Sequence, residues 1–180
     1  HTLQIADGLW LDKKFKAAMM KSIAQSELDR KRFVYSDIGF ILLQQVVEAV
    51  TGKILDAYLV SEFYRPMGLE HTLFQPLNRY KKADIMPTAA NDYLRRQDLC
   101  GYVHDEAAAF MGGVSGNAGL FSTAQELGKI YQMILNEGEL DGKRYLRPET
   151  CRIFTTEKSA VSHRGLGYDK PNLKDPKANA

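Results

Sequence analysis

The sequence lacks most of the features that place a protein in a class at once. Its 180 residues include only two cysteines, Cys100 and Cys151, which allow one disulfide or two free thiols and so indicate no compartment. No apolar run reaches the ~18 residues of a membrane-spanning helix. The net charge of +2 is too small to indicate a nucleic acid or an acidic partner. What remains is an ordinary globular composition, sized for one domain or most of one.

Metal and phosphate motifs are missing as well. The four histidines show neither the helical i, i+4 spacing nor the Cys/His spacing of a zinc site, so we expect no metal and no cofactor. The glycine-rich stretch 111–119 has neither a Walker motif nor a strand followed by G-x-G-x-x-G. Its glycines let backbone pass close to something else, either in a tight turn without ligand or in the wall of a binding cleft. We expect His104-Asp105-Glu106 to be a polar loop or helix start that holds this stretch in place.

The main pattern in the sequence is the spacing of apolar residues that is typical of α-helices. Apolar spacing predicts helices over roughly 13–25, 38–51, 54–64, 124–136 and 148–154. The helix over 38–51 is expected to be buried, because its polar side chains share one narrow face, and Gly52 ends it. Thr123 and Glu126 form the pattern of a capping box before the helix over 124–136. From Gln75 to Asp98 we expect a long irregular excursion, and near the end of the chain one strand around 165–169.

Directly before the helix over 38–51 stands the stretch "FVYSDIGF", which places Tyr35 two residues before Asp37. In one interpretation Ser36 or Asp37 caps the helix while Tyr35 packs beneath it. In the other, the phenol lies in a cleft beside a lysine ammonium, where its anion is favoured, and moves protons to and from a serine. Asp37 would then hold that ammonium in place.

Four blocks in order resemble the serine beta-lactamase-related hydrolases, which include class C beta-lactamases, DD-peptidases and related esterases. "YSDIGFILLQQVVEAVTGK" is similar to the Tyr-x-Asn block and its helix, and "FYRPMGLEHTLF" to the Pro-Leu-Gly-Met-x-x-Thr segment. "GLFSTAQELGKIYQMILNEG" is similar to the Gly-Leu-x-Ser-Thr helix. "GYVHDEAAAFMGGVSGNAGLFST" resembles the version attached to family 3 glycosidases of Bacteroidetes-type bacteria, so a fused glycosidase domain is expected.

The sequence departs from this family in two ways. It contains neither the Ser-x-x-Lys nucleophile motif ahead of Tyr35 nor the later Lys/His-Thr/Ser-Gly block. It also has Asp37 where the family pattern has asparagine. The resemblance therefore implies the helical middle of an α/β fold, mainly α in this chain, with most of the sheet absent. Residues 1–180 would be a partial domain, inactive by itself, with a disordered tail over 171–180. The chain also begins at His1, as a processed or excised chain would, so its missing signal peptide carries no weight.

The resemblance implies acyl-enzyme chemistry on an ester or amide of a small-molecule or peptide substrate, outside the cytoplasm. Tyr35 and Asp37 would be the catalytic residues, with a nucleophile outside this chain, and Asn117, Gly119 and Ser122 would line the substrate cleft. An aspartate at 37 accepts hydrogen bonds but donates none, and its charge raises the pKa of a neighbouring lysine. We therefore expect peptidase or esterase activity rather than efficient beta-lactam hydrolysis.

Two alternatives stay open at this point. One is a non-catalytic module that binds cell-wall peptides or a protein partner, and the other is a helical scaffold in which Tyr35 belongs to the core.

Overall fold

A computed structural model describes residues 2–27, 34–156 and 162–171, which form two compact units. The first unit comprises residues 1–28 and 35–123, and the second comprises 29–34 and 124–180. Every sequence-predicted site residue lies in the first unit, so each unit is described by itself below.

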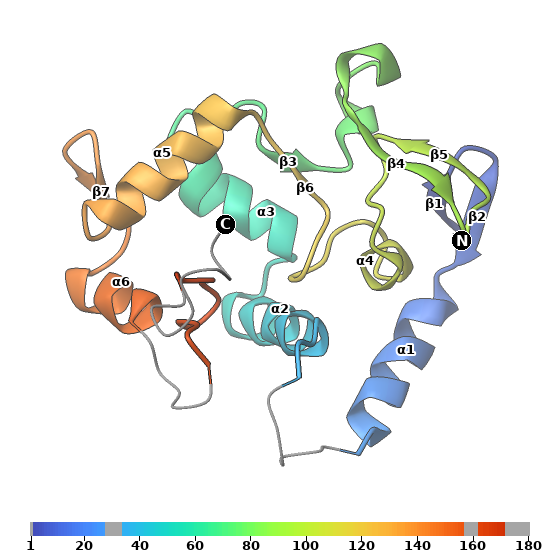
Figure 1. Cartoon of the computed structure of the whole chain (residues 1–180), viewed down its shortest axis with the longest axis horizontal. Coiled ribbons are helices and arrows are strands. Elements are labelled where there is room, and N and C mark those ends of the chain that lie inside the picture. Colours follow the sequence, from blue (N-terminus) through green and yellow to red (C-terminus); the bar gives the residue numbers. More distant parts are fainter. Residues whose placement is uncertain (1, 28–33, 157–161, 172–180) are drawn as a thin grey trace. The chain divides into compact units, whose positions relative to one another are not determined.

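The first unit contains four α-helices, six strands and three short helical turns among its described residues (Figure 1). Its helices are α1 (Lys14–Gln25), α2 (Ile38–Thr51), α3 (Leu55–Leu59) and α4 (Glu106–Phe110). Its strands are β1 (Thr2–Ala6), β2 (Leu9–Asp12), β3 (Leu73–Phe74), β4 (Pro87–Asp92), β5 (Gln97–Cys100) and β6 (Leu120–Phe121). One π-helical turn spans Val60–Tyr64, and 3₁₀ turns span Pro76–Asn78 and Lys82–Asp84.

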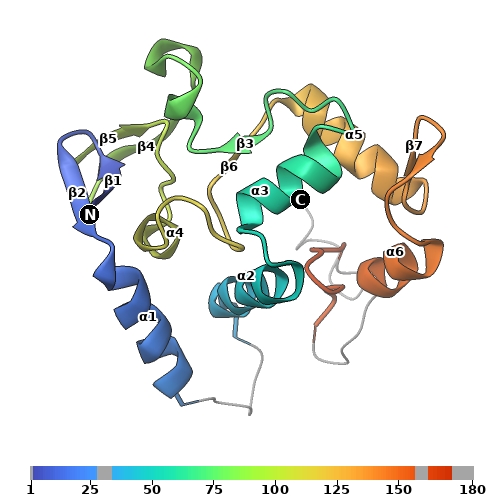
Figure 2. The ribbon, with the colours of Figure 1, turned by 180° about the vertical axis from the view of Figure 1, so that it is seen from behind.

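The strands of this unit pair antiparallel as β1–β2, β3–β6 and β4–β5, each pair forming a two-stranded sheet. The β1–β2 and β4–β5 hairpins lie side by side in both views (Figure 1 and Figure 2). Between the hairpins and α4 lies a small apolar core of Ile5, Val103, Ala108 and Ala109, with Leu11 and Ala118 packed against it. This core joins segments that are far apart in the sequence, and it carries the glycine-rich stretch on one side.

The second unit consists of α5 (Ala124–Leu135), the hairpin β7 (Glu139–Leu140) and β8 (Lys143–Arg144), and α6 (Pro148–Thr155). Gly138 ends the α5 segment at φ +95°, and its N–H donates to the carbonyl of Met133 at 2.8 Å. A side chain there would meet the carbonyl oxygen of Leu146 at 2.2 Å, so only glycine fits. Pro148 stands in the first turn of α6, where its missing N–H costs nothing.

The five predicted helices are confirmed in position. The bounds of α2 agree with the prediction, and Gly52 ends it in the left-handed conformation at φ +68°. The predicted helix over 54–64 is α3 followed by a π-helical turn, in which the N–H of Arg65 reaches back to the carbonyl of Val60.

The expected burial of α2 is wrong for most of its apolar side chains. Among its residues only Ile41 and Gln44 are buried, while Leu43, Val46 and Val50 are 56%, 55% and 81% exposed. Periodicity shows which side of a helix is apolar, but burial also needs a surface that covers this side. No described part of the first unit covers these three side chains.

Two predictions about irregular segments are also wrong. The stretch from Gln75 to Asp98 is not structureless, because it holds two 3₁₀ turns, β4 and the start of β5. Its strands escaped detection because β4 begins with proline and its pairing with β5 is shifted twice. The expected strand over 165–169 is a turn instead, in which the N–H of Gly165 donates to the carbonyl of Tyr168. Of the predicted disordered tail over 171–180, residues 172–180 lie outside the described residues.

No single helix among the described residues is long and apolar enough to cross a membrane, although α2 and the segment Leu55–Tyr64, bent by 68°, pass that test as a pair on length and composition.

Candidate active site

Tyr35 and Asp37 lie at the start of α2, and the structure contradicts the capping-and-packing interpretation for both. The side chain of Tyr35 is 67% exposed and therefore does not belong to the core. Asp37 occupies the N-cap position but forms no side-chain capping hydrogen bond. Ser36, one position earlier, accepts from the N–H of Ile38 at 3.3 Å, which is a local i, i+2 hydrogen bond ahead of the helix. The phenol is thus directed away from the core, and the carboxylate is not used for capping.

The glycine-rich stretch packs directly on α2, a few residues after Asp37. The buried side chain of Gln44 accepts from the N–H of Gly116 at 3.1 Å and donates to the carbonyl of Val114 at 3.3 Å. A Cβ on Gly116 would lie 2.1 Å from the carbonyl oxygen of Phe40, so this close approach requires glycine. The segment that carries Asn117 and the helix that carries Asp37 are therefore fixed to each other.

Asn117 is held on both sides of its carboxamide. Its Nδ2 donates to Oδ1 of Asp105 at 3.0 Å, and its Oδ1 accepts from the hydroxyl of Ser115 at 2.6 Å. Asp105 also caps α4, because the same oxygen accepts from the N–H of Ala108 at 2.7 Å. The prediction that the His104–Glu106 segment is a helix start that holds the glycine-rich stretch is confirmed.

A cavity of about 320 Å³ opens between α2, α3 and this stretch. Its wall is mainly apolar, and Asn117 is among its lining residues together with Phe40 and Gln44. The glycines thus make a tight turn that lines a cavity, and a ligand in this cavity stays a prediction.

The other two predicted cleft residues have different surroundings. Gly119 has φ +106°, and a Cβ there would lie 2.5 Å from the carbonyl oxygen of Gly113, so its role is to close the turn. The hydroxyl of Ser122 forms a hydrogen bond of 2.7 Å with Thr72 Oγ1, which ties the end of β6 to the segment before β3. The structure thus places Asn117 in the wall of the cavity beside α2, whereas the hydroxyl of Ser122 pairs with Thr72. The capping box of Thr123 and Glu126 stays a prediction.

Sequence reasoning missed the ion pair of Asp92 and Arg95, which lies beneath this site. Their side chains are 6% and 0% exposed, and they meet through two hydrogen bonds, Nε to Oδ1 at 2.9 Å and Nη2 to Oδ2 at 2.8 Å. Hydrogen bonds from the Arg95 guanidinium lower the pKa of Asp92 to about 2. Arg95 also donates to the carbonyls of Val103 and His104. The only signal in the sequence was an i, i+3 charge pair, which is common on exposed surfaces.

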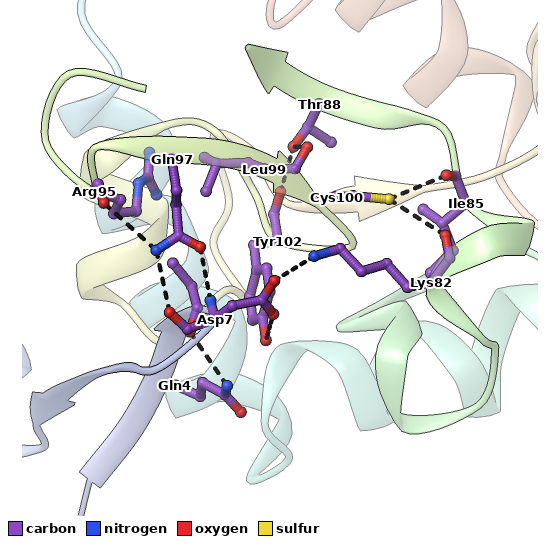
Figure 3. A network of polar contacts seen from close by, with 11 residues as sticks. Gln4, Asp7, Lys82, Ile85, Thr88, Arg95, Gln97, Leu99, Cys100 and Tyr102 are labelled. Carbon is purple, nitrogen blue, oxygen red and sulfur yellow. Dashed lines mark hydrogen bonds and ion pairs between the residues drawn. The ribbon is translucent and has the colours of Figure 1, made fainter. Parts of the chain in front are cut away.

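A second polar network joins the two hairpins (Figure 3). At its centre Asp7 pairs with Lys82, accepts from the hydroxyl of Tyr102 at 3.2 Å, and exchanges two backbone hydrogen bonds of 3.1 Å with the Gln97 carboxamide. The hydrogen bond from Lys82 lowers the pKa of Asp7, whereas burial is the main cause that raises the pKa of Tyr102. These contacts fix the hairpin arrangement behind the core.

Both cysteines are free thiols, which answers the question that the sequence left open. Cys100 donates to the carbonyls of Lys82 and Ile85, and Cys151 is buried. Among residues 2–27, 34–156 and 162–171, no three His, Cys, Asp or Glu side chains gather in a way that could hold a metal ion.

Comparison with known proteins places this geometry in a family. The Beta-lactamase family matches residues 1–171, and the chain belongs to it. The resemblance inferred from the four sequence blocks is therefore confirmed at the level of the family.

Two relatives carry the names of a carboxypeptidase and an amidase. The chain is 37% identical, over 87% of its length, to a protein of Escherichia coli K12 named "Putative D-alanyl-D-alanine carboxypeptidase". It is 36% identical, over 79% of its length, to the N-acetylmuramyl-L-alanine amidase of Bacillus subtilis. It spans 39% and 35% of the lengths of these relatives.

Among solved structures, the octameric penicillin-binding protein homologue from Pyrococcus abyssi matches 88% of the chain with a TM-score of 0.61. The chain covers 35% of that structure at 18% sequence identity, so this likeness shows the fold alone.

Proposed function

We propose that the complete protein is a serine hydrolase that cleaves an amide or ester through an acyl-enzyme, with an alanine-containing cell-wall peptide as its substrate class. The observation that carries this proposal is the family match over residues 1–171, combined with relatives whose names contain D-alanyl-D-alanine and N-acetylmuramyl-L-alanine. The longer relatives leave room for the Ser-x-x-Lys motif, which these 180 residues do not contain.

In this proposal a serine from outside residues 1–180 attacks the carbonyl carbon of the substrate. A serine–carbonyl bond forms, the bond to the leaving nitrogen or oxygen breaks, and the serine proton passes through Tyr35 to the leaving group. Water then attacks the acyl-serine ester, which releases the acid and restores the serine. The exposure of Tyr35 supports this role, because a phenol that moves protons must reach the substrate side of the domain.

Asp37 would orient a catalytic lysine and the substrate. A carboxylate keeps the acceptor of an amide but lacks its N–H donors, and its negative charge favours the protonated lysine. Both effects weaken an enzyme that relies on a neutral lysine and on a donated hydrogen bond to a lactam. Peptidase or esterase activity is therefore proposed over efficient beta-lactam turnover.

The test uses the complete gene product and intact-protein mass measurement. We expect a fluorophosphonate to add its mass covalently to the wild type, and Tyr35→Phe to lose this adduct while its melting temperature is unchanged. A peptide ending in D-alanyl-D-alanine should lose its terminal residue with the wild type only. Reaction of Tyr35→Phe at the wild-type rate would contradict the assigned role.

A non-catalytic module that binds a cell-wall peptide or a protein partner is the second candidate. A complete protein that binds the peptide but takes up neither fluorophosphonate nor penicillin would establish it. Location outside the cytoplasm and fusion to a glycosidase domain stay predictions.

A further inference from the structure

The carboxamide of Asn117 has a defined orientation because of what surrounds it. A carboxylate only accepts hydrogen bonds, so the Nδ2 group of Asn117 must face Asp105 and its oxygen must face the Ser115 hydroxyl. These two contacts use one of the two N–H donors and one of the two lone pairs of the amide. One donor and one acceptor are left on the carboxamide of a residue that lines the 320 Å³ cavity.

The backbone directly before Asp105 is held by the guanidinium of Arg95. The Asp92–Arg95 pair is buried, and the guanidinium donates to the carbonyl of Val103 at 3.0 Å and to that of His104. These are the two residues directly before Asp105. Because the carboxylate fixes the planar guanidinium in one orientation, the guanidinium in turn holds the two backbone carbonyls to which it donates.

We propose that Asp105, held in place by Arg95, is a positioning residue that orients Asn117 to bind the backbone amide of a peptide substrate. A peptide amide offers one N–H and one C=O, which complement the acceptor and the donor left on Asn117. The inference rests on the proposed function, because it assumes that the cavity beside α2 belongs to the substrate site.

The test separates this role from the capping role of the same side chain. In the complete protein, Asp105→Ser keeps an N-cap but is too short to accept from Asn117. We expect KM for the D-alanyl-D-alanine peptide to rise about three- to tenfold, as for the loss of one hydrogen bond, with kcat within about twofold. Asp105→Asn, which keeps both the cap and an acceptor, should return KM to within about twofold of the wild type.

The matched control is Asp98→Ser. Asp98 also accepts from a backbone N–H, that of Asn91 at 2.8 Å. Within the described part of the chain it forms no hydrogen bond or ion pair with Asn117 or Asp105, so KM should not change. A double-mutant cycle completes the design. In an Asn117→Ala background, Asp105→Ser should add nothing to KM, because the group through which it acts is gone.

Each outcome bears on the proposal. An unchanged KM in Asp105→Ser, or additive effects in the cycle, overturns the positioning role while the proposed function stands. A lower melting temperature with reduced kcat at constant KM shows a purely structural role and overturns it too. A wild type that takes up no fluorophosphonate and releases no D-alanine overturns the proposed function and this inference with it.

Discussion

At the scale of single residues, two ion pairs of similar length contribute very differently to the protein. Asp92 and Arg95 meet at 2.8 Å with side chains almost fully buried, whereas Lys53 and Glu62 meet at 2.8 Å with side chains 48% and 47% exposed. Removing one partner of a buried pair leaves an uncompensated charge in the interior. Removing one partner of an exposed pair leaves a charge that water solvates. The contribution of these two ion pairs to stability therefore depends on their burial and not on their length.

We predict that Arg95→Met lowers the free energy of unfolding by about 3–5 kcal/mol, because Asp92 keeps its buried charge without a partner. The matched change Lys53→Met should cost much less, because water already solvates both charges of that pair. Urea unfolding of both variants measures the difference. Equal losses in the two variants would show that the Asp92–Arg95 pair is no more important than a surface contact.

A second prediction at this scale concerns Asp37. Asp37→Asn in the complete protein supplies the missing N–H donor and removes the negative charge beside the proposed lysine. We expect penicillin turnover to rise by up to about tenfold, the value of one restored hydrogen bond. Steady-state hydrolysis of penicillin is the measurement, with peptide hydrolysis as the reference. Turnover that stays at the wild-type value would refute this account of the departure from the family pattern.

At the scale of the elements, α2 shows how local rules set the ends of a helix while its surroundings set its burial. Gly52 takes a left-handed conformation at φ +68°, which ends the helix after Thr51. Gly39 lies in the first turn of the same helix with ordinary helical backbone, and a Cβ would meet nothing within 4 Å at either glycine. Gly39 and Gly52 therefore differ in backbone conformation and not in the space available to a side chain.

The same substitution should therefore have opposite effects at the two glycines. Gly52→Ala forces an L side chain into the left-handed region and should destabilise the protein by about 1–2 kcal/mol. Gly39→Ala removes backbone freedom from the unfolded chain and should stabilise it by about 0.5–1 kcal/mol. Thermal unfolding of both variants decides. Destabilisation by Gly39→Ala would mean that its surroundings, and not backbone conformation, control that position.

At the scale of the whole molecule, the apolar side chains of α2 and the missing nucleophile motif lead to one proposal. Leu43, Val46 and Val50 are exposed, and the chain spans 39% of the length of its carboxypeptidase-named relative. An exposed apolar helix face is costly in water unless something covers it. We propose that this chain is the helical part of a larger α/β domain and that the remainder of that domain covers α2.

The corresponding prediction compares the 180-residue chain with the complete gene product. The chain alone should take up no fluorophosphonate, because it contains no Ser-x-x-Lys motif, and it should bind a hydrophobic dye on its exposed apolar surface. The complete product should take up the label and bind much less dye. Labelling of the chain alone would show that a nucleophile lies within residues 1–180 and would contradict the proposed division of the site.

The sequence by itself determined the helices, the glycines that end them, and the family. Helical periodicity and left-handed glycines are local properties, so the bounds of α2 follow from residues 38–52 alone. Four ordered blocks were likewise enough for the family, since each is a continuous stretch of sequence.

Only the tertiary structure decided which polar groups act together. Nothing in the sequence shows that Arg95 reaches the carbonyls before Asp105, or that Asp105 holds Asn117, because these contacts join a hairpin, a helix start and a glycine turn. It also decided that Tyr35 is exposed and that α2 presents its apolar side chains uncovered. Burial and long-range hydrogen bonds depend on which surfaces meet, and periodicity and spacing describe only one segment at a time.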